Sequence, residues 1–406
     1  MRERIDFFFL NMGHFLDHLF VLIIATVAAL GLAAEWGTTW DALIPYATPC
    51  FVAFGLGAIP AGWLADKWSR PGMMILFFIG IGLSSILAGF TTNKWELMAA
   101  LLLLGLFAAI YHPVGIAMVV HGREKTGMAL AINGVWGNLG VASAALIGGF
   151  MVEHFGWRAA FFLPGGFAIL TGIAYAAFLW SGRAQAAAEI ASGAAARKAA
   201  AGTVEVDPAV LKRIFAVILV TTALGSLIFQ MTTFSLPKIF DERLGDFAAN
   251  PTQVGWWAFV VFTLAAFAQL VVGYLIDRHS IRTVFLVVAG LQPPLFAVMM
   301  YLFGVPALLV ALGFMLLVFG QIPINDALIA RVTKSQWRSR AYSVRLFIGF
   351  GISSTAIPLI AWQHHHWGFV SVFLTMAVLS AIIVFAVARL PGTTELAGQP
   401  AAAAAE

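Results

Sequence analysis

Charged side chains are scarce in this sequence: Asp, Glu, Lys and Arg together make up 10% of its 406 residues. Soluble domains carry about 25% charged residues. A chain that is 61% hydrophobic could not keep so much apolar surface out of water. The scarcity of charge therefore excludes an ordinary soluble domain and makes lipid part of the protein's solvent.

Cysteine and the common enzyme motifs are also missing. The single cysteine, Cys50, excludes an internal disulfide and a thiolate metal cluster. No Walker-type G-x-x-x-x-G-K-[ST] sequence occurs, so ATP is not the expected energy source. Neither G-x-S-x-G nor H-E-x-x-H is present. We therefore expect no enzyme activity, and we assign no cofactor and no resident metal.

Long apolar stretches, by contrast, are abundant. Twelve of them are separated by charges, Pro/Gly pairs and Asn/Asp turns, and each is near the length of about 20 residues that a spanning helix needs. This pattern predicts an all-α membrane protein with twelve transmembrane helices. The stretches lie at residues 7–33, 41–65, 72–91, 96–120, 126–152, 158–180, 211–236, 253–276, 283–303, 306–330, 340–362 and 368–388.

The basic residues are distributed unevenly between the two sides that these helices define. With a cytoplasmic N-terminus, 19 of the 23 Lys and Arg residues fall on the inner side. Only Lys94, Arg158, Lys238 and Arg243 fall on the outer side. The positive-inside rule then predicts a bacterial-type inner-membrane protein with both termini in the cytoplasm. Because topology explains the net positive charge, no nucleic-acid partner is expected.

An Ala-rich segment with scattered charges divides the twelve stretches into two sets of six. We expect an N-terminal half at residues 1–180, a cytoplasmic linker at 181–210 and a C-terminal half at 211–390. The remaining residues, 391–406, end in an alanine run and are expected to form a disordered tail.

A short phrase occurs twice, about half a chain apart. The first copy, GWLADKWSR, occupies residues 62–70, and the second, GYLIDRHS, occupies residues 273–280. The leading glycines let helices approach closely. The carboxylate of Asp66 lies at the C-terminal end of its helix, where the helix dipole disfavours a negative charge unless a partner stabilises it. Two similar halves in apolar sequence indicate a transporter in which one half rocks against the other.

Six plus six spans, a long middle loop and the repeated phrase resemble the major facilitator superfamily. Its signature is G-x-L-a-D-[RK]-x-G-[RK], from which this chain departs at Ser69, and residues 156–158, GWR, are another common feature of that family. The resemblance implies two pseudo-symmetric halves, alternating access and a monomer. It also implies an inner gate made by Gly62, Asp66, Lys67, Arg70, Gly273, Asp277 and Arg278. A charged loop that only fixes the topology is the other interpretation of these residues.

Three further pieces resemble the fosmidomycin-resistance branch of drug:proton antiporters. They are HFLD at residues 14–17, YHP at 111–113 and GVWGNLG at 134–140. This resemblance implies export in exchange for protons. The chain has Val114 where that branch often has an acid. It also lacks the Gly-Pro pair that the branch has in its fifth span, here residues 126–152, and an arginine in the fourth span, here residues 96–120. Import of a small organic metabolite by proton symport therefore remains an alternative.

The first span carries His14, Asp17 and His18 on one helical face. Ionisable groups at membrane depth are costly and usually functional, and a carboxylate beside imidazoles can exchange protons with them. We predict that Asp17 carries the coupling proton and that the two histidines tune it. The same trio suits a divalent metal ion, so a metal exporter is a further alternative. A structural hydrogen-bond cluster is the third interpretation.

Polar residues in other spans are the candidates for binding a substrate. Pro113 follows Tyr111 and His112 and frees a backbone carbonyl within the membrane. An apolar cavity with amide and aromatic side chains suits a small amphipathic organic molecule. The candidates are Tyr111, His112, Asn133, Asn138, Gln230, Gln321 and Asn325.

Two charges in the last spans are expected to pair. Asp326 and Arg345 lie at similar depth because their helices run in opposite directions, and an ion pair is the natural solution for two charges in lipid. The pair is either structural or part of the gating cycle. The run His364-His365-His366 is expected in a short outer loop open to water, where it would bind no metal.

Overall fold

The computed structural model describes residues 2–121, 126–181, 208–332, 344–345 and 347–391. Within these residues all regular structure is helical. Most of the predicted linker and nearly all of the predicted tail lie outside the described residues.

The N-terminal half consists of long apolar helices, several of which continue through short π or 3₁₀ segments. They are α1 (Arg2–Val27) with η1 (Ala28–Leu32) and α2 (Ala33–Glu35), α3 (Trp40–Leu43) with η2 (Ile44–Ala47) and α4 (Thr48–Lys67), α5 (Arg70–Phe90), α6 (Lys94–Ala108) with η3 (Tyr111–Gly115) and α7 (Ile116–Val120), α8 (Thr126–Phe155) and α9 (Ala159–Trp180).

The C-terminal half repeats this pattern of long helices interrupted by short breaks. Its elements are α11 (Pro208–Arg243), η4 (Gly245–Ala248), α12 (Pro251–Arg278), α13 (Ile281–Gly290), α14 (Gln292–Met299), α15 (Gly304–Gly320), α16 (Ile322–Val332), a helical stretch at residues 347–353 and α18 (Ala356–Ala388).

Eleven helical ranges among the described residues are long and apolar enough to cross a membrane. The last of them, Phe347–Ala388, is 42 residues long, which corresponds to about 63 Å of helix and about twice the hydrocarbon thickness of a bilayer. It breaks at Gly368, whose φ of 62° and ψ of −164° divide it into two helices. Glycine tolerates this conformation because it has no Cβ. Counting the two helices of this range separately, the described residues contain twelve helical ranges long enough to cross a membrane, which is the number that the hydropathy pattern predicts.

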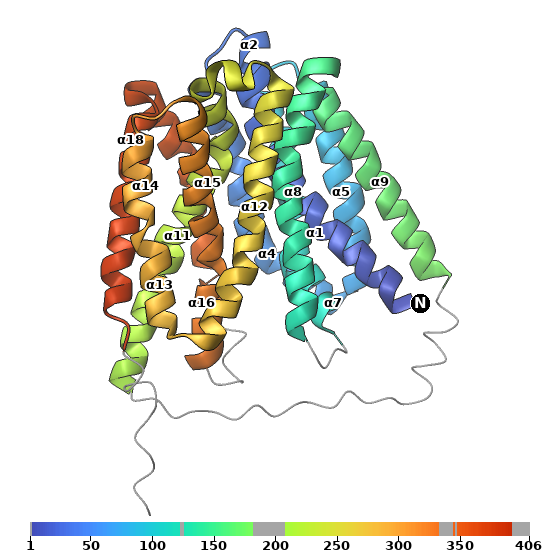
Figure 1. Cartoon of the computed structure of the whole chain (residues 1–406). Helices are drawn as coiled ribbons and strands as arrows, with labels where there is room; N and C mark the ends of the chain where they lie inside the picture. Colours follow the sequence, from blue (N-terminus) through green and yellow to red (C-terminus); the bar gives the residue numbers. More distant parts are fainter. Residues whose placement is uncertain (1, 122–125, 182–207, 333–343, 346, 392–406) are drawn as a thin grey trace, which may run out of the picture.

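The two halves stand beside each other as two bundles, with α1 to α9 on the right and α11 to α18 on the left of Figure 1. The N-terminus lies at the lower end of the bundle (Figure 1). We call this end, which also holds Lys67 and Arg278, the near side. The opposite end, which holds Glu35, Asp41 and Glu242, is called the far side.

Helices α8 and α12 run side by side at the centre of the molecule and join the halves (Figure 1). Their close approach depends on glycine. A Cβ on Gly255 would lie 2.4 Å from the carbonyl oxygen of Ala145, and one on Gly149 would lie 2.3 Å from that of Pro251. Small residues at helix crossings allow such backbone contact in membranes, so these two glycines hold the far-side ends of the halves together.

Candidate functional site

A cavity of about 1110 Å³, counted with its opening to solvent, lies between the halves. Its two walls differ in chemistry. The N-terminal half contributes mainly apolar side chains and one imidazole, whereas the C-terminal half contributes amides, hydroxyls and a guanidinium in addition to apolar side chains such as Phe229 and Val318. The first set is His18, Val21, Leu22, Phe51 and Phe54, and the second includes Thr221, Gln230, Gln292, Gln321, Asn325 and Arg345.

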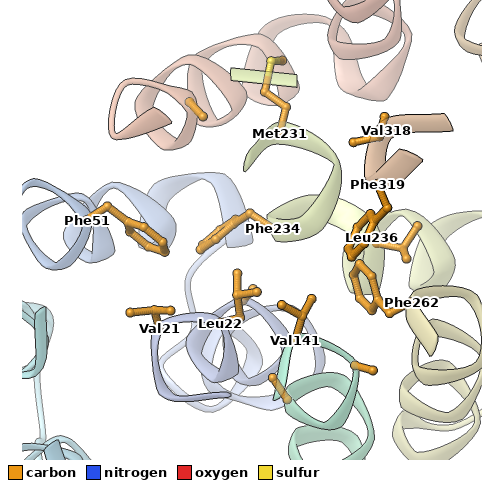
Figure 2. Packing of buried hydrophobic residues seen from close by; sticks show 14 of the residues in the cluster. Val21, Leu22, Phe51, Val141, Met231, Phe234, Leu236, Phe262, Val318 and Phe319 are labelled. Carbon is orange, nitrogen blue, oxygen red and sulfur yellow. The ribbon is translucent and has the colours of Figure 1, made fainter. Parts of the chain in front are cut away.

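An apolar layer closes the cavity toward the far side. Figure 2 shows the rings of Phe51 and Phe234 pointing toward each other, with Val21 and Leu22 beside them. The two ring centroids are 6.0 Å apart, and all four side chains are buried. Because Phe51 comes from α4 and Phe234 from α11, this layer seals the two halves against each other.

Beyond this layer, a polar cluster also links the halves at the far side. His364 Nε2 lies 3.0 Å from a carboxylate oxygen of Glu242, and its Nδ1 lies 3.6 Å from Asp41. His365 Nδ1 lies 2.8 Å from the other oxygen of Asp41. Asp41 belongs to the N-terminal half, so it ties α3 to α18 of the C-terminal half. We call these four residues the far-side cluster.

The expectation of a loop at residues 364–366 is wrong, whereas His365 and His366 are exposed to solvent as expected. Helix α18 continues through these histidines and turns only at Gly368. The side chain of His364 is only 13% exposed and packs edge-on against Trp40. The helix length therefore brings two imidazoles to the carboxylates, of which His364 is largely withdrawn from solvent and His365 stays 65% exposed.

We expect Asp41→Asn to shift the protein toward a state open on the far side. The change weakens the contacts to His364 and His365, and loss of hydrogen bonds worth about 0.5–1.5 kcal/mol changes a two-state equilibrium by about two- to tenfold. Labelling of a cysteine placed at Thr233 in the cavity, from the far side, measures this change. Asp246→Asn, at an exposed position in η4, is the matched control. Unchanged labelling would show that the cluster does not hold this side closed.

The gate residues of the repeated phrase lie apart on the near side. Asp66 pairs with Arg70 at 2.9 Å within its own half, and the guanidinium of Arg278 lies 3.7 Å from the ring centroid of Tyr274. Lys67 and Asp277 are exposed. Among the described residues, no hydrogen bond or ion pair joins the two copies of the phrase.

The two glycines of the phrase differ in their surroundings. A Cβ on Gly62 would lie 3.3 Å from the Cβ of Pro113, whereas one on Gly273 would meet nothing within 4 Å. Only the first copy therefore shows the close packing that its glycine predicts. A latch between the copies stays a prediction for a state in which the near side is closed.

Asp17 lies in the interior of the N-terminal half, behind the cavity wall. Its side chain is fully buried, and one carboxylate oxygen lies 3.4 Å from Nε2 of His112. Within the described part of the chain, neither carboxylate oxygen has a hydrogen-bond partner. A buried carboxylate without hydrogen bonds is costly in its charged form. This makes Asp17 the polar group of the site that most needs a proton or a cation.

His14 connects this carboxylate region with the cavity. Its Nδ1 lies 2.8 Å from the backbone oxygen of Asn133, so Nδ1–H donates and Nε2 keeps its lone pair. That Nε2 lies 3.2 Å from Nε2 of His18, which lines the cavity. Gly137 provides the space, because a Cβ there would lie 2.6 Å from the His14 ring. The two imidazoles form a path from the cavity toward His112.

Tyr111 and Asn133 support the His14 ring and do not line the cavity. The Tyr111 ring stacks on His14 with centroids 4.8 Å apart, and its hydroxyl donates to the carbonyl of Leu10 at 2.8 Å. The Asn133 side chain donates to both Tyr111 and Asn11. These two of the predicted binding residues therefore form a buried scaffold.

His112 and Asn138 differ from that scaffold. The ring of His112 lies 5.5 Å from that of Phe350, a cavity-lining residue of the other half. Asn138 is half-buried on α8 and does not belong to the cavity lining. The sequence did not single out Asn11 as a partner in this network.

The trio predicted on the first span gains a member from η3. The ligand atoms of His14, His18 and His112 lie within 4.8 Å of one another. Three imidazoles in such an arrangement could hold one divalent transition-metal ion. Asp17 is adjacent to this group because it contacts His112. A metal site would therefore be formed by histidines of α1 and η3 together, and not by the predicted trio of α1 alone.

The predicted polar residues of the C-terminal half all reach the cavity. Gln321 accepts a hydrogen bond from Gln292 at 2.9 Å, and Asn325 accepts one from Thr221 at 2.8 Å. Gln292 was missed by the sequence analysis, although a glutamine before two prolines in an apolar span was a usable signal. Gln230 also lines the cavity.

The expected ion pair between Arg345 and Asp326 is present, and Arg345 also faces the cavity. Both side chains keep some contact with solvent. Whether the pair breaks during the cycle stays a prediction.

The family of the chain follows from a comparison of its sequence with protein-family models. The Major Facilitator Superfamily model matches residues 10–246 and 239–405. The chain therefore belongs to this superfamily of multi-pass membrane transporters, which move small molecules and are not enzymes. The resemblance to the fosmidomycin-resistance branch stays a prediction.

Two solved structures share the fold across almost the whole chain. Both are of a bacterial homologue of the human lysosomal transporter Spinster. The inward-facing, occupied form matches with a TM-score of 0.71 and 14% identity, covering 96% of this chain and 94% of that one. The inward-facing, unoccupied form matches with a TM-score of 0.63 and 13% identity, covering 96% and 95%. At this identity the likeness shows the arrangement of helices alone.

Proposed function

We propose that this protein is a proton-coupled secondary transporter that exports a small amphipathic organic molecule by alternating access. The observation that carries this proposal is the placement of Asp17. A fully buried carboxylate without a hydrogen-bond partner in the described structure lies beside three imidazoles, of which one lines the central cavity. A proton is the simplest particle that neutralises such a carboxylate.

The proton path follows the imidazoles. A proton entering the cavity first meets His18, whose Nε2 is 3.2 Å from that of His14. The rings of His14 and His112 are 5.4 Å apart, and His112 Nε2 is 3.4 Å from Asp17. An imidazole can accept a proton on one ring nitrogen and release one from the other. The substrate cavity and the proton site therefore share His18.

Movement of the halves can respond to this proton. Phe350 of the C-terminal half rests against His112 and against Phe54, with ring centroids 5.5 Å and 4.9 Å apart. A change of charge on His112 or Asp17 alters the cost of keeping this apolar contact. Protonation thus favours one arrangement of the halves over the other, which is what alternating access requires.

The charge distribution supports a cytoplasmic near side. Nineteen of the 23 basic residues fall on the inner side of the predicted topology. With that orientation both termini lie in the cytoplasm of a bacterial-type cell, and the cavity is sealed from the outside. The transporter acts as a monomer in the bilayer, with the substrate and protons as its partners. Export is the direction that the resemblance of residues 14–17 and 111–113 favours.

Transport in proteoliposomes tests this proposal. Purified protein is reconstituted with a candidate substrate on one side, and a pH gradient is imposed in either direction. We expect substrate to move against its gradient only when protons flow the opposite way, and collapse of the pH gradient by an ionophore to stop this movement. Substrate flux that ignores the pH gradient would contradict proton coupling, and co-movement with protons would favour the symport alternative.

Transport of a divalent cation is the second candidate, favoured by the grouping of His14, His18 and His112. The same proteoliposomes, loaded with a metal-sensitive dye, distinguish it. Entry of Zn²⁺ or Mn²⁺ that is lost in His18→Ala, without any organic substrate, would favour this candidate.

A further inference from the structure

Two buried glutamines on the C-terminal wall of the cavity hold amide groups that have no acceptor. Gln230 on α11 is 7% exposed, and Gln321, which follows α15, is 5% exposed. In the described structure neither Nε2 atom has a hydrogen-bond partner, and both residues line the cavity. Native proteins rarely leave buried donors unpaired. A ligand that brings acceptors would satisfy them.

The orientation of the Gln321 amide is set by its neighbour. Gln292 Nε2 lies 3.3 Å from the backbone oxygen of Val288 and 2.9 Å from Oε1 of Gln321. A backbone carbonyl only accepts, so it requires the NH₂ group of Gln292 at this place. Gln321 must then present its oxygen to Gln292. Its own NH₂ group is left with its two donors unused.

The rest of the cavity lining favours an anion. Among the described lining residues there is no Asp or Glu, whereas His18 is present together with Arg345, whose guanidinium is ion-paired with Asp326. The hydroxyl of Thr222, in the same wall, also has no partner in the described structure. Donors therefore outnumber acceptors among the unpaired groups, and no carboxylate in the lining repels a negative charge.

The opposite wall accepts an apolar group. Val21, Leu22 and Phe51 face the cavity from the N-terminal half and continue into the apolar layer shown in Figure 2. A ligand with one polar end and one apolar end matches two walls of this kind, because orientation comes from a few polar contacts in a mainly apolar site.

We propose that the cavity binds an amphipathic organic carboxylate, with the carboxylate oxygens accepting hydrogen bonds from Nε2 of Gln230 and of Gln321. The apolar part lies against the N-terminal wall. This inference rests on the proposed function only in that it takes the same cavity as the substrate site. It names the substrate class, and it does not depend on proton coupling or on the direction of transport.

Binding of three matched probes tests the charge preference. The full chain in lipid nanodiscs, without a pH gradient, is titrated calorimetrically with 4-phenylbutyrate, 4-phenylbutylamine or 4-phenyl-1-butanol, and empty nanodiscs correct for partition into lipid. We expect the carboxylate to bind at least about tenfold more tightly than the alcohol, since hydrogen bonds to a charged acceptor are the stronger ones. The amine is expected not to bind.

Isosteric variants test the two glutamines. Gln230→Glu and Gln321→Glu keep the shape of the side chain but replace donors by a carboxylate. We expect each to weaken binding of 4-phenylbutyrate about tenfold or more, and to permit binding of 4-phenylbutylamine. Elution as a single species and an unchanged unfolding temperature show that a variant is folded.

A glycine on α11 provides a test that leaves both glutamines in place. A Cβ on Gly225 would lie 2.8 Å from Nε2 of Gln321 and would push this amide from its position. Gly225→Ala should therefore weaken binding of 4-phenylbutyrate. Gly351→Ala, in the same half, is the matched control, because a Cβ there meets nothing within 4 Å.

Three outcomes would overturn the inference: no binding of the carboxylate up to its solubility limit, equal or tighter binding of the amine, or full affinity in both glutamate variants. These outcomes are separate from those of the flux experiment. A protein that binds the carboxylate but shows no response to a pH gradient contradicts proton coupling and leaves this inference intact. Proton-driven flux of another substrate class, without binding of the carboxylate, supports proton coupling and contradicts this inference.

Discussion

Replacing Asp17 by asparagine is expected to abolish substrate movement driven by a pH gradient. Asparagine keeps the size of the side chain but cannot take up or release a proton, so the coupling step is lost. Exchange of labelled for unlabelled substrate, which needs no net proton movement, should continue. In proteoliposomes we expect gradient-driven flux to fall to the level of liposomes without protein, while exchange stays measurable.

The environment of Asp17 makes this variant structurally mild. The carboxylate is fully buried and has no hydrogen-bond partner in the described structure, so a neutral amide removes no hydrogen bond and alters only the 3.4 Å contact with Nε2 of His112. The unfolding temperature should therefore be unchanged or higher. Asp246→Asn, at an exposed position, is the control for the chemistry of the substitution. If Asp17→Asn still concentrates substrate in response to a pH gradient, Asp17 does not carry the coupling proton.

Introducing valine at Gly255 is expected to hold the far side open. Its Cβ would lie 2.4 Å from the backbone oxygen of Ala145, in the contact between α8 and α12. Overpacking of this kind costs about 1–3 kcal/mol. Because the contact joins the two halves, separation of their far-side ends relieves the clash. A shift of that size changes a two-state equilibrium by about five- to 150-fold.

Cysteine labelling from the far side measures this shift. In a Cys50→Ala background, a cysteine at Thr233 in the cavity is exposed to a membrane-impermeant maleimide in right-side-out vesicles. We expect slow labelling in the parent and much faster labelling with Gly255→Val. Gly166→Val, on α9, is the control because a Cβ there meets nothing within 4 Å. Equal labelling in all three proteins would show that the α8–α12 contact does not govern opening.

The depth of a residue in the membrane could be predicted well from the sequence. Each helical residue adds about 1.5 Å along the axis, so position in an apolar stretch gives depth without any knowledge of packing. This explains why the ion pair between Asp326 and Arg345 could be anticipated. It also explains why Gln230, Gln321 and Asn325 were placed inside the membrane before their contacts were known.

The direction in which a side chain points around its helix could not be predicted equally well. His112 lies beside Asp17 because the π-helical turn η3 rotates it toward α1. Tyr111, only one residue earlier, points to Leu10 and Asn133. Such rotations depend on which helices are neighbours, and hydropathy carries no information about that. In this structure Tyr111 and Asn133 therefore support the His14 ring and do not line the cavity, and their role in binding stays a prediction.

The position at which a helix ends was also predicted poorly from the sequence. The histidines at 364–366 belong to α18 because the chain turns only at Gly368. In the sequence, the apolar stretch had already ended at residue 362, so a loop was the natural expectation. The carboxylates of Asp41 and Glu242 make the longer helix favourable, and they come from two distant elements.

By itself, the sequence determined that this protein is a helical membrane protein with twelve crossings, two related halves and a strongly biased distribution of basic residues. These properties depend on the hydropathy and charge of each stretch separately, because each stretch partitions between lipid and water largely independently of the others. The tertiary structure decided the rest: that His112 joins His14, His18 and Asp17, that two glutamines of the cavity lining keep unused donors, and that Asp41 and His364 join the halves at the far side. Contacts between distant segments depend on how helices rotate and approach one another, and only packing in three dimensions determines this.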